Sequence, residues 1–327
     1  MSTQGGMKAV FAALAANLGI AVTKGIAFAF TGSSSMLSEA IHSLADSGNQ
    51  ALLLIGHRRS KREASQTHPF GYGRSRYVYA FIVAIILFTV GGLFSLYEGF
   101  HKLTHPEALT DAWIAFLVLG VAIVLEAFSL RTALREANHA RGSRSLWRFI
   151  RDVRQPELPV VLLEDIGALA GLFFALFGVS MATITGNGQW DGIGAMAVGS
   201  LLVVIAIFLS LEMNAMLIGE SALPEEVDRI RQAINTTADS DRVIHLRTLH
   251  VGPDELLVVA KIAVSEADQG QSISIDIDQT EARIRAAVPS ARYIFLEPDI
   301  RHGQDSVRDR SLSSPVDQEG PPAPPLV

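Results

Sequence analysis

The sequence contains no cysteine among its 327 residues. This absence excludes disulfide bonds, thiolate metal sites and cysteine nucleophiles, although it says nothing about the compartment in which the protein works. Charge is also scarce, because charged residues make up only 18% of the chain, against about 25% in a typical soluble domain. No GxxxxGK[ST] motif occurs, which argues against ATP as an energy source. The net charge of −6 gives no reason to expect a nucleic-acid partner.

Long apolar runs take the place of the missing charge. A membrane-spanning helix needs about 20 mainly apolar residues, and six stretches of the sequence meet that requirement. They are Met7–Thr31, Ser34–Gly56, Tyr77–Phe100, Ala112–Leu134, Leu158–Ile184 and Gly192–Leu217. The first run is too long for the apolar core of a signal peptide, so we expect it to be a retained span. The sequence therefore predicts an all-α membrane domain of six transmembrane helices in a lipid bilayer.

Basic residues gather in alternate loops between these runs. The loops after the second and fourth runs contain Arg58, Arg59, Lys61 and Arg62, and Arg141, Arg144, Arg148, Arg151 and Arg154. The short loops at 31–35 and 185–190 carry no charge. The positive-inside rule then predicts that both termini and both basic loops are cytoplasmic. We expect a multi-pass protein of the cell's inner (plasma) membrane, because a soluble helical bundle has no reason to show this asymmetry.

The composition changes after Gly219, where the apolar runs end. Helical periodicity and strand-like segments follow in the order Pro224–Ile234 (helix), Val243–Val251 and Leu256–Val264 (strands), Ile275–Val288 (helix) and Tyr293–Leu296 (strand). This αββαβ order predicts a small α+β domain. From residue 301 on, Ser, Pro, Gly and charge dominate, which predicts a disordered tail. The expected domains are thus 1–220, 221–300 and the tail 301–327.

Charged residues inside the apolar runs are the candidate functional site. His42 and Asp46 are four residues apart in the second run, so they share one face of a helix, and Asp165 lies in the fifth run. An ionisable group at bilayer depth costs at least about 2.5 kcal/mol, and it usually faces a pathway. A neutral imidazole with two carboxylates suits a divalent cation. The alternative is that these groups only hydrogen-bond between helices and hold the bundle together.

Neighbouring residues of the fifth run bear on how this site is assembled. Glu164 precedes Asp165 directly and lies about 100° away around the helix, so the two are not expected to share a role. Gly167 and Gly171 have the spacing that lets another helix approach closely. We expect this approach to bring Asp165 to the second run.

Two further buried charges are weaker candidates. Lys24 lies in the first run on the same helical face as Asn17, and we expect it to pair with Glu39 or to extend toward an interface. Glu126 lies in the fourth run, and its contact with a transport pathway is left as an open alternative.

Several motifs of the chain resemble the cation diffusion facilitator family, whose members are proton-coupled exporters of zinc, iron and manganese. The segment Ser38–Asn49, SEAIHSLADSGN, is similar to the family's HxxxD or DxxxD helix, and His68–Arg74, HPFGYGR, is similar to its HPxGxG signature. Asp165 matches the second position of the family's fifth-helix pair. The chain is most similar to the branch that contains mammalian zinc transporter 9, with which it shares TGSSSM at 31–36 and the pair Glu164–Asp165.

The resemblance covers roughly residues 7–300, and it implies both a fold and a ligand set. It implies six transmembrane helices, a ferredoxin-like cytoplasmic domain and a homodimer. It also implies one metal ion held between the second and fifth helices by His42, Asp46 and Asp165.

The fourth ligand of the family's metal site is missing from this sequence. Val161 stands four residues before Asp165, where many members have His or Asp. Water, Glu164, Asn49 or Ser43 remain as alternatives for the fourth ligand. Glu164 is the first choice, although on a regular helix its angle is unfavourable and local unwinding would be needed.

Residues and resemblance together predict a transporter and not an enzyme. We expect secondary antiport, in which a divalent cation leaves the cytoplasm while protons enter, because the ligands must lose protons to bind metal. Zn²⁺ is the expected substrate, with Fe²⁺, Co²⁺ or Mn²⁺ as alternatives. A membrane metal sensor or scaffold that binds without transport stays open as a second hypothesis. An exporter of small organic cations is a third, which the aromatic content of 7% disfavours.

Overall fold

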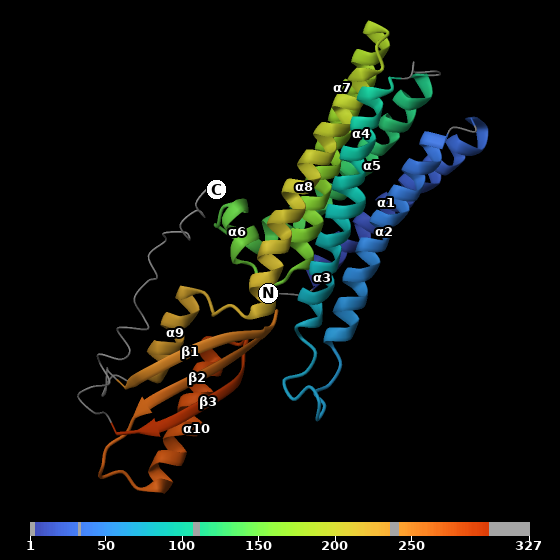
Figure 1. The fold of residues 1–327 in the computed structure, drawn as a ribbon. Helices are drawn as coiled ribbons and strands as arrows, with labels where there is room; N and C mark the ends of the chain where they lie inside the picture. Colours follow the sequence, from blue (N-terminus) through green and yellow to red (C-terminus); the bar gives the residue numbers. More distant parts are fainter. Residues whose placement is uncertain (1–3, 32–33, 107–111, 236–241, 301–327) are drawn as a thin grey trace, which may run out of the picture. The chain divides into compact units, whose positions relative to one another are not determined.

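The computed structural model describes residues 4–31, 34–106, 112–235 and 242–300 (Figure 1). Side chains at 4–6, 27–28, 30–31, 34–42, 45 and 112 lie outside the described part of the chain, and so does the predicted tail at 301–327. The chain divides into two units, each described by itself below. The first unit holds the helices up to Gly219 together with the turn Val251–Asp254, and the second holds the rest of the chain from Glu220.

The first unit is a bundle of long helices. In chain order its elements are α1 (Gln4–Thr31), α2 (Ser34–Ser60), α3 (Ser75–Ile86), the π-helical η1 (Leu87–Leu93), α4 (Phe94–Thr104), α5 (Ala112–Arg141), α6 (Leu146–Asp152), α7 (Glu157–Thr185) and α8 (Gln189–Ile218). Among the described residues, five stretches are long and apolar enough to cross a membrane, namely Met7–Ile26, Ser75–Thr104, Trp113–Arg141, Glu157–Thr185 and Gln189–Ile218. The prediction of a helical membrane domain is therefore confirmed. The remaining predicted span, Ser34–Gly56, lies in α2, which is not one of these five.

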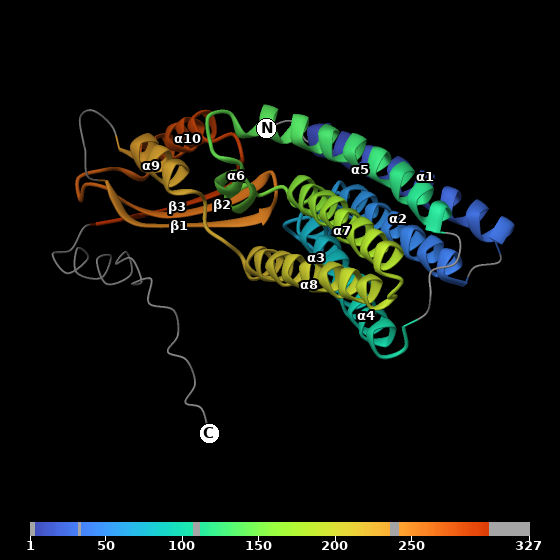
Figure 2. The ribbon, with the colours of Figure 1, turned by 90° about the horizontal axis from the view of Figure 1, so that it is seen from above.

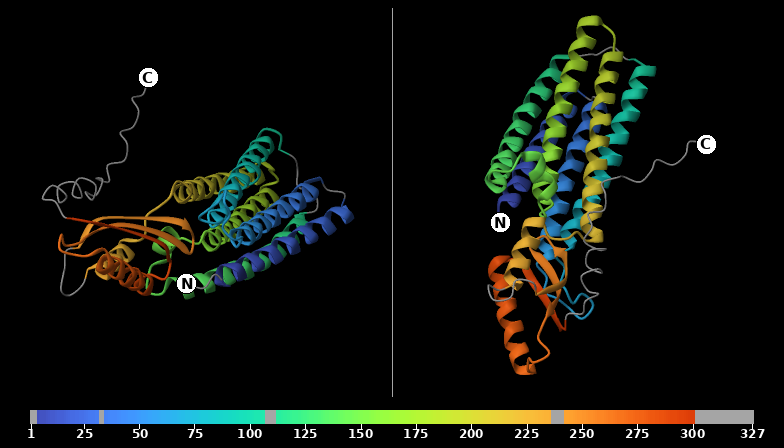
Figure 3. Two further views of the ribbon diagram at one scale, coloured as in Figure 1. Left: turned by 90° about the horizontal axis from the view of Figure 1, so that it is seen from below. Right: turned by 90° about the vertical axis from the view of Figure 1, so that its left-hand side faces the viewer.

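The long helices lie alongside one another, as Figures 2 and 3 show. α1 packs between α2 and α5, and α8 packs against both α4 and α7. The segment η1 joins α3 to α4 without a break. α7 ends where Gly186 adopts a φ of 69°, a left-handed conformation that glycine enters without steric cost. α8 begins at Gln189, so these two helices are joined by the short uncharged loop that the sequence predicts.

Glycines allow α4 and α8 to approach each other closely. A Cβ atom at Gly199 would lie 2.7 Å from the backbone nitrogen of Leu96, and a Cβ atom at Gly99 would lie 2.7 Å from the backbone nitrogen of Met196. Both contacts are to backbone atoms, which cannot rotate away as a side chain can. The contact between α4 and α8 therefore depends on the absence of side chains at these positions.

The second unit is a small sheet with two helices on one face, as Figure 2 shows. Its elements are α9 (Pro224–Ile234), β1 (Val243–Gly252), β2 (Glu255–Ala263), α10 (Gly270–Ala287) and β3 (Ala291–Asp299). The strand order is β1-β2-β3, and β2 runs parallel to β3 with Val258 opposite Ile294. Ile230 and Ile284 of the helices are fully buried in the same core as Val258. The predicted small α+β domain is thus confirmed. Its third strand is longer than the predicted segment Tyr293–Leu296.

We expect Gly199→Ala to lower the unfolding midpoint of the purified protein in detergent, because its methyl group would force α4 and α8 apart. Overpacking of this kind costs about 1–3 kcal/mol. Gly120→Ala in α5 is the matched control, since a Cβ atom at Gly120 would have no neighbour within 4 Å in the described part of the chain, and both changes add the same helix propensity. Equal midpoints for the two variants would show that the close contact does not hold the bundle together.

Candidate functional site

A polar pocket of about 230 Å³ lies inside the helical unit. The inner end of the pocket is lined by Asp46 of α2, Glu164 of α7 and Leu202 of α8. All three residues lie well inside their helices. From there the pocket extends to Lys102 and Asp191, which lie at the last turn of α4 and the first turn of α8. The pocket therefore occupies the half of the bundle that is remote from the basic loops.

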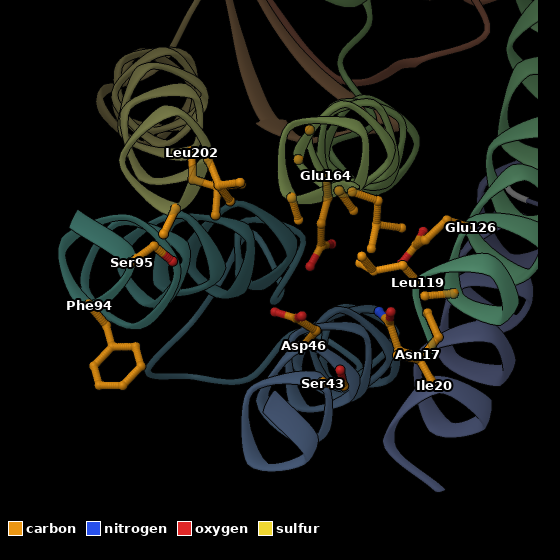
Figure 4. A pocket seen from close by; sticks show the side chains of 18 of the residues that line it. Asn17, Ile20, Ser43, Asp46, Phe94, Ser95, Leu119, Glu126, Glu164 and Leu202 are labelled. Carbon is orange, nitrogen blue, oxygen red and sulfur yellow. The ribbon is translucent and has the colours of Figure 1, made fainter. Parts of the chain in front are cut away.

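Asp46 and Glu164 point toward each other across this pocket, as Figure 4 shows. Asp46 is half-buried on α2, and Glu164 is 6% exposed on α7. Asp165, the next residue of α7, lines the same pocket. Acidic groups gathered among apolar helices attract a cation, because the low-dielectric walls screen their field only weakly.

Glu164 is held by donors from α2. The side-chain nitrogen of Asn49 donates to one oxygen of Glu164 over 3.1 Å, and that of Gln50 donates to the other over 2.8 Å. Asn17 of α1 donates in turn to the amide oxygen of Gln50 over 3.3 Å. All four side chains are buried, so these bonds connect α1, α2 and α7 at the depth of the pocket.

Asp165 faces a different helix. Its carboxylate accepts a hydrogen bond of 2.7 Å from the hydroxyl of Ser129 on α5, and both side chains are buried. α7 is a continuous helix through this region, and Glu164 reaches its donors on α2 without local unwinding. The 100° step between adjacent residues is enough to turn Glu164 toward α2 and Asp165 toward α5.

The structure describes the side chains of only part of the predicted ligand set. The side chain of His42 lies outside the described residues, although its backbone is part of α2. Among the side chains that are described, no three His, Asp or Glu groups are close enough together to hold a metal ion. Val161 is fully buried in the hydrophobic core of the bundle, so this position brings no ligand into the pocket.

Lys24 and Glu126 also line the pocket. The ammonium group of Lys24 donates to the hydroxyl of Ser43 over 3.3 Å, and its predicted partner Glu39 lies outside the described side chains. Glu126 is 5% exposed on α5. Its place in the pocket makes it a candidate for the pathway that the sequence left open.

The glycines of α7 serve a different contact from the one expected. A Cβ atom at Gly167 would lie 2.6 Å from Ile205, and one at Gly171 would lie 3.3 Å from Val198, both on α8. The prediction that this stripe brings Asp165 to the second span is therefore wrong. The stripe packs α7 against α8, and polar side chains connect α7 to α2.

Ion pairs lie at both ends of the bundle, and the residues of one of them also line the pocket. At the end with the basic loops, Arg76 of α3 makes two hydrogen bonds, of 2.5 and 2.6 Å, to the carboxylate of Glu157 on α7, and His57 of α2 lies 3.8 Å from the same carboxylate. All three residues are buried. At the other end, Lys102 lies 2.9 Å from Asp191 and both are part-buried. Sequence analysis missed the first pair, because both residues border predicted spans and look like ordinary interfacial charges.

An apolar helical bundle with buried acidic residues around an internal pocket is typical of a membrane transport protein. Residues 10–218 match the model of the cation efflux transmembrane domain. The chain belongs to this family, the cation diffusion facilitators, whose members are transporters and not enzymes.

Three relatives illustrate the range of the similarity. The proton-coupled zinc antiporter SLC30A9, mitochondrial, of Mus musculus is 35% identical over 68% of this chain and 39% of its own length. Metal tolerance protein C4 of Arabidopsis thaliana is 29% identical over 69% of this chain and 50% of its own. Magnetosome protein MamB of Magnetospira sp. is 26% identical over 86% of this chain and 90% of its own. The chain thus spans about two fifths of the length of the first of these relatives.

The comparisons correct the predicted location. The zinc antiporters of Mus musculus, Homo sapiens, Pongo abelii and Xenopus laevis are all named as mitochondrial, so the assignment to the cell's inner (plasma) membrane is wrong. Apolar runs and basic loops orient a chain in a bilayer, but they do not distinguish one bilayer from another.

The sequence predicts Asp165 as a zinc ligand, and on that prediction we expect Ser129→Ala to weaken zinc binding about 10–100-fold, the usual cost of removing a group that orients a ligand. Without the hydroxyl, the carboxylate of Asp165 loses its donor on α5. Thr132→Val is the matched control, because among the described residues the hydroxyl of Thr132 bonds only to the backbone oxygen of Phe128 on the same helix. Calorimetric titration of the protein in detergent measures the effect, and equal affinities for both variants would contradict it.

Proposed function

We propose that the chain exchanges a divalent metal cation for protons across its membrane, with Zn²⁺ as the expected substrate and Fe²⁺, Co²⁺ or Mn²⁺ as alternatives. The observation that carries this proposal is the pair Asp46 and Glu164, facing each other in an internal pocket of a cation efflux protein. The name of the mouse relative, a proton-coupled zinc antiporter, supports both the metal and the counter-ion.

The proposed metal ligands are His42, Asp46 and Asp165, with Glu164 as the fourth. Their chemistry fits a borderline divalent ion, since imidazole and carboxylate both bind zinc. The side-chain oxygen of Asn49 is buried and has no hydrogen-bond partner among the described residues. An amide oxygen next to a carboxylate suits a hard cation, so Asn49 is the second choice for the fourth ligand.

Proton exchange follows from the same ligands. Carboxylates and imidazole bind metal only in their unprotonated forms, so metal and protons compete for one set of atoms. Arrival of the metal releases protons on one side of the membrane, and protonation on the other side releases the metal. The competition itself couples the two fluxes, and no separate proton site is required.

An alternating-access mechanism explains why the pocket extends toward only one end of the bundle. The pocket extends from Asp46 toward Lys102 and Asp191, whereas apolar side chains and the buried pair Arg76–Glu157 occupy the opposite end. Separation of α3 from α7 at that pair would admit ions from the side of the basic loops. We include in this proposal α2 as a sixth membrane span, a ferredoxin-like C-terminal domain and a homodimer.

Flux in proteoliposomes with an imposed proton gradient tests the proposal. We expect the wild-type protein to move Zn²⁺ faster than Mn²⁺, and Asp46→Asn and Asp165→Asn each to lower the zinc flux at least about tenfold, since even a group that only orients a ligand is worth that much. Asp152→Asn is the control, because Asp152 lies on α6 and pairs only with Arg148 among the described residues.

Each result of this experiment points to one interpretation. Wild-type flux in both pocket variants would refute the ligand assignment. Zinc binding by the wild-type protein with no proton-coupled flux would instead favour the metal sensor or scaffold. Flux of Fe²⁺, Co²⁺ or Mn²⁺ above that of Zn²⁺ would keep the mechanism and change the substrate.

A further inference from the structure

A second hollow, of about 460 Å³, lies on α5 away from the polar pocket. Its lining consists of Ala127, Leu130, Arg131, Leu134, Arg135 and Asn138 of α5 and Leu169 of α7. The α5 residues recur every three or four positions, so they form one stripe along the helix. None of these residues lines the polar pocket, and the hollow is a separate feature of the bundle.

Two unpaired guanidinium groups dominate this hollow. Arg131 and Arg135 are one helical turn apart and both are exposed. Among the described residues, neither side chain forms an ion pair or a hydrogen bond. Glu136, the nearest acid on α5, lies 3.7 Å from Lys8 of α1. Other arginines of the bundle do have partners, such as Arg76 with Glu157, so these two positive charges remain available to an anion from outside the protein.

The hollow lies at the boundary of the bilayer. Arg131 follows Trp113, the first residue of the α5 span, by a distance of about 27 Å at 1.5 Å per residue. The hydrocarbon core of a bilayer is about 30 Å thick. Arg131 and Arg135 are therefore at the level where hydrocarbon gives way to headgroups, on the side of the basic loops.

The remaining lining is apolar. Leu130, Leu134 and Leu169 are half-buried, and they offer a surface to a hydrocarbon chain beside the two charges. Asn138 accepts a hydrogen bond from Arg141 with its side-chain oxygen, which leaves its amide hydrogens free to donate. An occupant of this hollow has to combine negative charge with an apolar tail at one end of the membrane.

We propose that this hollow binds an anionic phospholipid, with the headgroup phosphate between Arg131 and Arg135 and an acyl chain along the leucines. A phosphate oxygen accepts two N–H donors of one guanidinium at once. A zwitterionic lipid is a poorer fit, because the described residues of the lining include no carboxylate for its cationic group. The proposal requires only that α5 spans the membrane, and it is independent of which ion is transported.

Native mass spectrometry of the full-length protein in detergent tests this site, with phosphatidylglycerol and phosphatidylcholine as the probes. Each basic residue near an anionic lipid contributes about 1 kcal/mol, which is about a fivefold gain in affinity. We expect the double variant Arg131→Gln, Arg135→Gln to bind phosphatidylglycerol about 30-fold more weakly and phosphatidylcholine unchanged. The variant Arg131→Lys, Arg135→Lys keeps the charge and is expected to keep most of the affinity.

The control is Arg148→Gln with Arg151→Gln, which removes two exposed charges from α6 instead. An equal loss of phosphatidylglycerol affinity in this control would overturn the proposal. The lipid would then be attracted by the overall positive charge of this end of the protein and not by a specific site. Equal affinity of the wild-type protein for both lipids would also overturn it. So would displacement of phosphatidylglycerol by millimolar inorganic phosphate, which would identify the hollow as a site for a free anion. Gel filtration of each variant checks that a loss of binding is not a loss of fold.

Discussion

A carboxylate buried among apolar helices needs donors, and the bonds from Asn49 and Gln50 to Glu164 meet this need. Loss of a hydrogen bond to a buried charged group costs about 1.5–3 kcal/mol, so the packing of α7 against α2 favours registers that keep these bonds. Because Gln50 also binds Asn17, one carboxylate sets the relation among three helices. The pocket exists where this polar contact replaces the apolar packing seen elsewhere.

The acidic residues of α7 contact different neighbouring helices. Glu157 and Glu164 are seven residues apart and lie on one face, directed at Arg76 of α3 and at α2, while Asp165 turns to Ser129 of α5. On the remaining side, the glycines pack against α8. α7 is thus the central element of the bundle, and any movement of it changes the surroundings of every acid it carries.

The sequence predicted where the elements lie better than where their side chains point. Run length located the apolar spans and periodicity located the α+β domain, since both are properties of consecutive residues. The different roles of Glu164 and Asp165 also followed from the helical step. Which of the two faces α2 could not be predicted, because the rotation of α7 is set by contacts such as Gly167 with Ile205, far apart in the sequence. The hydrogen bond from Ser129 to Asp165 could not be predicted for the same reason.

The π-helical segment Leu87–Leu93 has a consequence for the register of the helix that contains it. A π-helical turn holds more residues than an α-helical turn, as if residues had been inserted into a regular helix. An extra residue in a regular α-helix would rotate everything that follows by about 100°. The wider turn takes up this rotation locally, so Gly99 still packs against α8 and Lys102 still reaches Asp191. The helical segments on either side of it can therefore each keep their own contacts.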